Sequence, residues 1–108
     1  MCALKTIREF CRAGVVAHES GDALGAAFQL HQAYAWAKGL KSPVLEAKIL
    51  NTMAVFAMAD QRPAKAVPML REAREKVAAR VGRSNKLYVV ITNNLIQAEA
   101  ASGRKSAA

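Results

Sequence analysis

The stretch SGDALGAAFQLHQAYAWAKG, residues 20–39, decides the fold of this 108-residue chain. It opens on a Ser-Gly-Asp turn and then places apolar residues three and four positions apart, which is the spacing of one face of a helix. That face consists of Ala26, Leu30, Ala33 and Ala37. Because alanine favours helix and adds little bulk, the stretch predicts a helix that closely approaches another one.

The same spacing returns further along the chain. A shift of 40 residues maps Gly21, Ala26, Leu30 and Ala33 onto Gln61, Ala66, Leu70 and Ala73. The same shift maps Phe10, Ala13, Gly14 and Ala17 onto Leu50, Met53, Ala54 and Ala57. A further shift of 42 residues leads to Thr92, Leu95, Ile96, Glu99 and Gly103. Self-similarity at this period predicts a helical solenoid.

The segments FCRAGVVA…GDALGAAFQL and LNTMAVFA…AKAVPML resemble the tetratricopeptide repeat, a pair of antiparallel helices. The long period, the join GRSNKLYVVITNNL and the helix starts LNT and TNNL are most similar to the repeats of kinesin light chains. The chain departs from the family pattern where Met53 and Ala13 replace Leu, Ala17 and Ala57 replace Tyr, and Gln61 replaces the turn Gly.

The resemblance implies an all-α fold, a right-handed α-α superhelix of about five antiparallel helices. It covers residues 1–102 as a single domain that contains repeat one (3–40), repeat two (42–82) and the lone first helix of a third repeat (84–102). Residues 103–108 are expected to form a short disordered tail.

Capping residues and prolines predict where the helices begin and end. The expected helices span about 3–18, 21–39, 43 onward, 63–82 and 84 onward. Their expected starts are Ser20 or Asp22, Ser42 with Pro43, Pro63, and Ser84, and Gly103 is expected to end the last helix. Pro68 removes one helical hydrogen bond, so we expect a kink or a late helix start there.

Composition limits the class of function. Alanine supplies 23 of the 108 residues, and the formal net charge is +8. No signal peptide or long apolar span is visible, so we expect a cytoplasmic protein that does not enter a membrane. The thiols of Cys2 and Cys11 have no zinc-site spacing, and His18 and His31 lie on different predicted helices. We therefore expect no enzyme activity, no metal and no cofactor, and we expect His18 to be a solvated or capping residue.

By resemblance, the first helix of each repeat lines a concave groove that binds a protein or peptide. The expected groove residues are Arg8, Cys11, Val15, Lys48, Asn51, Val55, Val90, Asn93, Asn94 and Gln97. Asparagine and glutamine amides both donate and accept hydrogen bonds, which suits them to the backbone of an extended peptide. The alternative for the asparagines is hydrogen bonding at helix ends or between repeats.

Residues 62–86 carry eight Lys and Arg side chains against two Glu, a surplus of six positive charges. Arg71 with Glu75 and Glu72 with Lys76 have the spacing of surface ion pairs. The predicted basic patch is Arg71, Arg74, Arg80 and Arg83. Such a patch attracts anionic partners, either an acidic protein or, as the alternative function, nucleic acid.

The last predicted helix has apolar residues on more than one side. Leu87, Val90, Ile91, Leu95 and Ala98 form one side, and Val89 and Ile96 lie on another. Because the outer face of a solenoid end is normally polar, we expect homo-oligomerisation or docking of another protein through residues 86–101. Tyr34 and Trp36 lie off the main stripe of their helix and are expected to pack in the core or between repeats.

Overall fold

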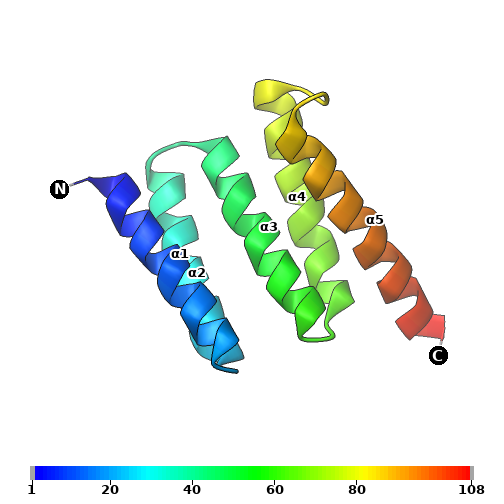
Figure 1. Ribbon diagram of the computed structural model, residues 1–108. Coiled ribbons are helices and arrows are strands. Elements are labelled where there is room, and N and C mark those ends of the chain that lie inside the picture. Colours follow the sequence, from blue (N-terminus) through cyan, green and yellow to red (C-terminus); the bar gives the residue numbers. More distant parts are fainter. Residues whose placement is uncertain (1, 108) are drawn as a thin grey trace.

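The computed structural model is all-α and describes the backbone of residues 2–107 and the side chains of residues 2–104. Over this range the helices are α1 (Ala3–Glu19), α2 (Ala23–Gly39), α3 (Pro43–Ala59), α4 (Pro63–Val81) and α5 (Lys86–Ala107). Successive helices run antiparallel and follow one another in a row, with α1, α3 and α5 on the near side in Figure 1. The predicted fold class, an all-α stack of helical hairpins, is confirmed.

Side chains cap the helices at the short turns. Asp22 accepts a hydrogen bond from the backbone N–H of Gly25 at 2.8 Å, and Ser42 accepts one from Leu45 at 3.4 Å. The Ser20 hydroxyl instead donates back to the carbonyl of Val16, so of the two predicted candidates Asp22 is the cap. The cap predicted at Ser84 is wrong in the same way, because Asn85 accepts from the N–H of Leu87 at 2.8 Å.

The turns show the 40-residue shift in their backbone geometry. Gly21 and Gln61 both adopt the left-handed region, with φ of 83° and 63°. In each turn the next N–H returns to a carbonyl near the end of the preceding helix, from Asp22 to Ala17 and from Arg62 to Ala57, both at 2.8 Å. Glutamine therefore adopts at position 61 the conformation that glycine adopts at position 21.

Two predicted helix boundaries are wrong. Helix α4 begins at Pro63 and continues through Pro68, so the expected late start does not occur. Pro68 and Ala64 are both exposed, so water can reach the carbonyl that loses its helical partner. Helix α5 continues past Gly103 to Ala107, and the tail predicted at 103–108 is helical as far as the structure describes it. A single glycine costs a helix only about 1 kcal/mol, which does not end it.

The stripe of small residues forms the core as predicted. Ala26, Leu30, Ala33 and Ala37 in α2 and Ala66, Leu70, Ala73 and Val77 in α4 are at most 1% exposed. Helix α1 closely approaches α2 at Gly14, where an added Cβ would lie only 3.0 Å from Cγ of Leu30. Helix α4 packs between α3 and α5, so its stripe joins the two ends of the row.

We predict that Ala66→Phe destabilises the fold, because position 66 is 0% exposed and has no room for a ring. Overpacking of this kind costs about 1 to 3 kcal/mol, measured as a shift of the urea midpoint. The matched control is Ala79→Phe on the same helix, where the side chain is exposed and the ring can enter water. Equal destabilisation by the two variants would show that the stripe is not the site of tight packing.

Candidate functional site

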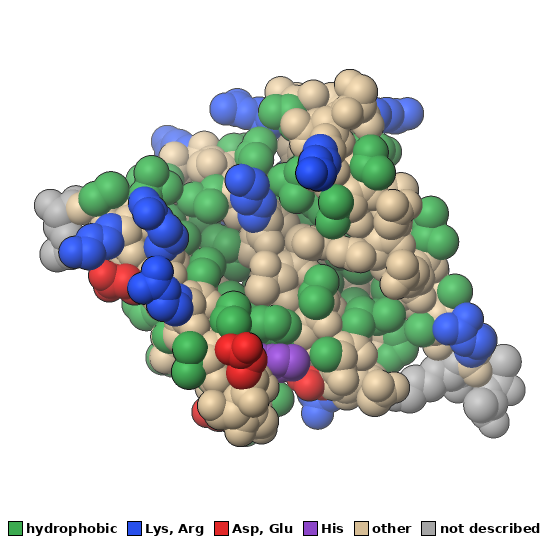
Figure 2. All heavy atoms as spheres, in the orientation of Figure 1, with side chains coloured by type: hydrophobic (Ala, Val, Ile, Leu, Met, Phe, Trp, Pro, Cys, Tyr) green, Lys and Arg blue, Asp and Glu red, His purple; other side chains and the backbone are tan. Residues whose placement is uncertain are grey.

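The predicted groove residues lie on three helices that form one face of the molecule. Three rows cross α1, α3 and α5 in turn: Arg8, Lys48 and Val90; Cys11, Asn51, Asn93 and Asn94; and Val15, Val55 and Gln97. Most of them are exposed, while Cys11, Asn51 and Asn94 are half-buried. Figure 2 shows this face, with hydrophobic side chains in the hollow between α1 and α3. We call this surface the front face.

The middle row of the front face contains a direct link between helices. The side-chain N–H of Asn94 donates to Oδ1 of Asn51 at 2.9 Å, which joins α5 to α3. These two amides therefore satisfy part of each other's hydrogen-bonding capacity, as the alternative of hydrogen bonding between repeats expects. Asn93 is the exposed asparagine of the row and is open to a ligand.

The outer rows differ in chemistry. Arg8 and Lys48 are exposed, and neither forms an ion pair with the side chains that the structure describes. Val15 and Val55 are 40% and 44% exposed, so each offers apolar surface to water. The front face thus places a cationic edge and an apolar edge on either side of a row of amides.

The two cysteines are free thiols in different surroundings. Burial raises the pKa of the half-buried Cys11 thiol, which disfavours the nucleophilic thiolate. Cys2 is exposed, and hydrogen bonding from the backbone of Lys5 and Leu4 lowers its pKa. In the front face Cys11 therefore acts as a small packing residue.

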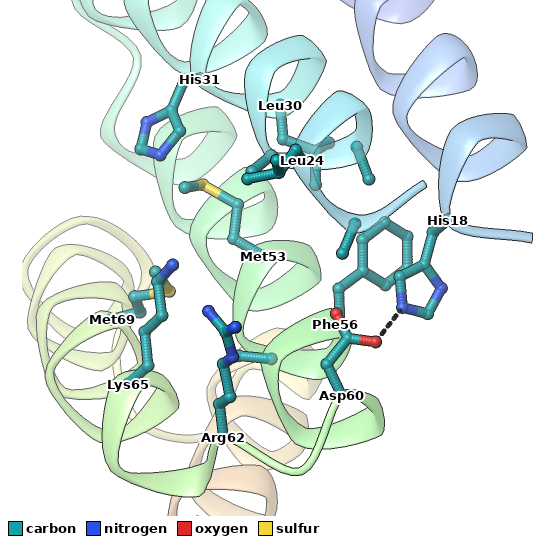
Figure 3. A pocket seen from close by; sticks show the side chains of 14 residues that line it. His18, Leu24, Leu30, His31, Met53, Phe56, Asp60, Arg62, Lys65 and Met69 are labelled. Carbon is teal, nitrogen blue, oxygen red and sulfur yellow. Dashed lines mark hydrogen bonds and ion pairs between the residues drawn. The ribbon is translucent and has the colours of Figure 1, made fainter. Parts of the chain in front are cut away.

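His18 is not the solvated or capping residue that we expected. Its ring stacks on the ring of Phe56 with centroids 4.1 Å apart, and Nε2 lies 3.1 Å from Oδ1 of Asp60 (Figure 3). Both partners belong to the end of α3 or to the turn after it. The contact ties the end of α1 to the end of α3, across 42 residues of sequence, so no local pattern indicated it.

Sequence reasoning also missed a polar cluster between α2, α3 and α4. Glu46, only 6% exposed, accepts a hydrogen bond from Nζ of Lys76 at 3.0 Å, and Lys76 also lies 3.6 Å from Glu72. The Tyr34 hydroxyl donates to Glu72 at 2.7 Å. Only the Glu72–Lys76 pair was predicted and is confirmed, because it is the one contact within a single helix.

Tyr34 and Trp36 have different surroundings. Tyr34 is partly buried against the core, as expected, and Lys38 lies over its ring at 5.5 Å from the centroid. The prediction for Trp36 is wrong, because its side chain is 45% exposed. It lies on the flank of α2 that no other helix covers.

The predicted basic patch does not form one face of α4. Arg71 pairs at 2.8 Å with Glu99 of α5, rather than with Glu75 as its spacing suggested. Arg74 and Arg80 are six positions apart, so on a helix of 3.6 residues per turn their side chains point about 120° apart. Arg83 lies beyond the end of α4, in the turn that follows Gly82.

Helix α5 has one covered side and one open side. Ile91, Leu95 and Ala98 are at most 1% exposed and belong to the core. Val89 and Ile96 point the other way and are 48% and 58% exposed. The corresponding side of α3 is covered by α4, which packs on α3 as the second helix of its hairpin.

Two further features were searched for in the part of the chain that the structure describes. None of its helices is both long enough and apolar enough to cross a membrane. No group of three or more His, Cys, Asp and Glu side chains there is arranged to hold a metal ion.

Comparison with models of protein families, with curated proteins and with solved structures finds no match to this chain. The resemblance to tetratricopeptide repeats therefore rests on the quoted residues, and the helical hairpins of the structure establish the all-α fold alone. Function has to be argued from the surfaces described above.

The polar cluster predicts a loss of stability at alkaline pH. Burial and the hydrogen bond to Glu72 raise the pKa of Tyr34 above its ordinary value of 10.0. The hydrogen bond to Glu46 raises the pKa of Lys76 above 10.5. Both groups hold their protons more tightly in the folded chain, so their stabilisation is complete below about pH 10 and is lost as the pH rises through the raised values.

We expect the thermal midpoint to fall as the pH increases from 9 to 11, and the fall to be smaller in Tyr34→Phe, which has no phenol to ionise. The measurement is thermal unfolding followed by circular dichroism at each pH. Tyr88→Phe is the matched control and should keep the slope of the wild type. A slope that Tyr34→Phe leaves unchanged would show that this phenol does not contribute to it.

Proposed function

We propose that this chain is a protein–protein interaction module that binds a peptide or partner protein along the front face. The observation that carries the proposal is the arrangement of the three rows, which places accessible cations, amides and apolar side chains side by side across α1, α3 and α5. Amides bind the backbone of an extended peptide, and the flanking rows select its side chains.

The chemistry of the rows specifies the partner. Arg8 and Lys48, without ion-pair partners among the described residues, favour an acidic residue in the ligand. Val15 and Val55 favour an apolar residue on the other side. The preferred ligand is therefore a segment that combines acidic and apolar side chains.

A capture experiment with matched variants tests the front face. The bait is the whole chain in three forms: wild type, Val55→Glu with Val90→Glu, and Val16→Glu with Val81→Glu. The second pair is the control, since Val16 and Val81 are 57% and 46% exposed and lie outside the front face. We expect partners from a lysate, identified by mass spectrometry, to be kept by the wild type and the control and lost from the front-face variant.

Retention of every partner by the front-face variant would refute binding at this surface. Each capture is repeated after nuclease treatment, because nucleic acid is the alternative ligand for a chain with net charge +8. Material that disappears with nuclease, and whose binding falls steeply with salt, would assign the function to the basic side chains instead.

We further propose that the open side of α5, formed by Val89 and Ile96, is covered in solution by a second copy of the chain. Support comes from the hairpins: α1 and α3 each have a second helix packed on them, and α5 has none among the described residues. Association would bury this apolar surface and would extend the short array, which is below the three repeats that usually give stability.

We predict that Val89→Lys with Ile96→Lys produces a monomer, because a charge on each chain would have to be desolvated at the contact. Sedimentation velocity over a range of concentrations is the measurement. Val16→Lys with Val81→Lys carries the same added charge on other surfaces and should behave as the wild type. A wild type that is monomeric at all concentrations would exclude the second copy as the occupant of this surface.

A further inference from the structure

A cavity of about 350 Å³ lies on the opposite side of the molecule from the front face, between α2 and α4. Its floor is the second half of α3, and the end of α1 borders it. Figure 3 views it from close by, with side chains from all four helices around one hollow. The apolar lining consists of Ala23, Leu24, Ala26, Ala27, Leu30, Met53, Phe56, Ala57 and Met69. The polar lining consists of His18, His31, Asp60, Arg62 and Lys65.

The cavity exists because α2 and α4 are joined at one end and separated at the other. Near the middle of the two helices the Tyr34 hydroxyl donates to Glu72, which connects them across the gap. Towards the start of α2 the residues on the α4 side are Ala23 and Ala27, whose methyl groups do not reach across. Nothing larger fills the space, so Leu30 and Met53 form its apolar base.

The charged groups around the cavity are mostly cationic. Arg62 and Lys65 extend from the start of α4 along the hollow towards Met53 and His31 (Figure 3). Neither makes an ion pair with the described side chains, and the one carboxylate in the lining, Asp60, is already bonded to His18. An anion in the cavity would therefore meet two free cations and no unpaired carboxylate.

The mouth of the cavity carries an unusually exposed apolar residue. Leu24 is 87% exposed, the highest exposure among the large hydrophobic side chains that the structure describes. It stands beside the apolar lining rather than beside charged neighbours on its own helix. A ligand whose apolar part enters the cavity would cover this side chain and bury its surface.

We propose that this cavity binds a small amphipathic carboxylate, with its hydrocarbon chain against Leu24, Leu30 and Met53 and its carboxylate between Arg62 and Lys65. The volume is at the lower end of the range of small-molecule pockets, which are apolar with a few placed polar groups. Charge-assisted hydrogen bonds from guanidinium and ammonium groups orient the carboxylate. The inference is independent of the proposed function, since the two surfaces share no residue.

Decanoate is the probe, titrated calorimetrically into the whole chain below the concentration at which it forms micelles. We expect one molecule bound per chain. Octanoate, shorter by two methylene groups, should bind about tenfold more weakly if the chain is buried. Decyltrimethylammonium, with a chain of the same length and the opposite charge, should bind at least tenfold more weakly than decanoate.

Two charge-reversal variants separate the site from the general positive charge of the protein. Arg62→Glu with Lys65→Glu should weaken decanoate binding by at least about tenfold. Arg80→Glu with Lys86→Glu changes the net charge equally at exposed positions outside the cavity and should leave the affinity unchanged. Ala27→Leu fills the cavity without changing charge and should also weaken binding, with circular dichroism confirming that each variant is helical.

The proposal is overturned if decanoate does not bind, if decyltrimethylammonium binds equally well, or if both charge-reversal variants lose affinity to the same extent. The front-face variant with Val55→Glu and Val90→Glu should keep its affinity for decanoate. Failure of the cavity and failure of the front face are therefore seen in different measurements.

Discussion

The close approach of helices at small residues is the constraint on which the rest of the structure depends. Four positions on α2 and four on α4 are almost completely buried, and most of them are alanine. Where Leu30 meets Gly14, the distance leaves no room for an added methyl group. Close crossings allow helices of 17 to 22 residues to bury their apolar stripes with few aromatic side chains. They also leave the opposite sides of α1, α3 and α5 free to present polar and half-exposed groups.

Polar contacts join the repeats where the stripes do not. Glu46 with Lys76, Asn51 with Asn94, and His18 with Phe56 and Asp60 each connect helices from different parts of the chain. Such contacts have a directional geometry that apolar packing lacks, so they define how far one hairpin is rotated against the next. Tyr34 with Glu72 has a second consequence, because it holds α2 and α4 at a distance that the alanines of α2 do not fill.

The two sides of the molecule therefore offer different kinds of binding surface. The front face is broad and crosses three helices, which suits an extended chain. The cavity behind it is compact, with an apolar base and two free cations, which suits a small amphipathic ion. Both follow from one architecture, in which first and second helices of the hairpins alternate between the two sides of a single row.

The amino-acid sequence by itself determined the helices, their order and the buried stripe. Those features depend on local spacing and capping: Asp22 and Ser42 start helices, and Leu30 and Leu70 occupy the same position of successive repeats. The front-face residues could be listed as well, because the repeat register places them on equivalent turns. Local preference was misleading only where one residue was weighed alone, as at Gly103, Pro68 and Ser84.

Only the tertiary structure decided which of these residues meet. Asn94 pairs with Asn51, Arg71 turns to Glu99 instead of Glu75, and His18 stacks on Phe56, and each pair combines residues from different helices. The cavity is likewise a property of the gap between α2 and α4 and has no counterpart in any single segment. The physical reason is that periodicity specifies which side of a helix is apolar, whereas the crossing angle and rotation between helices depend on all packed side chains at once.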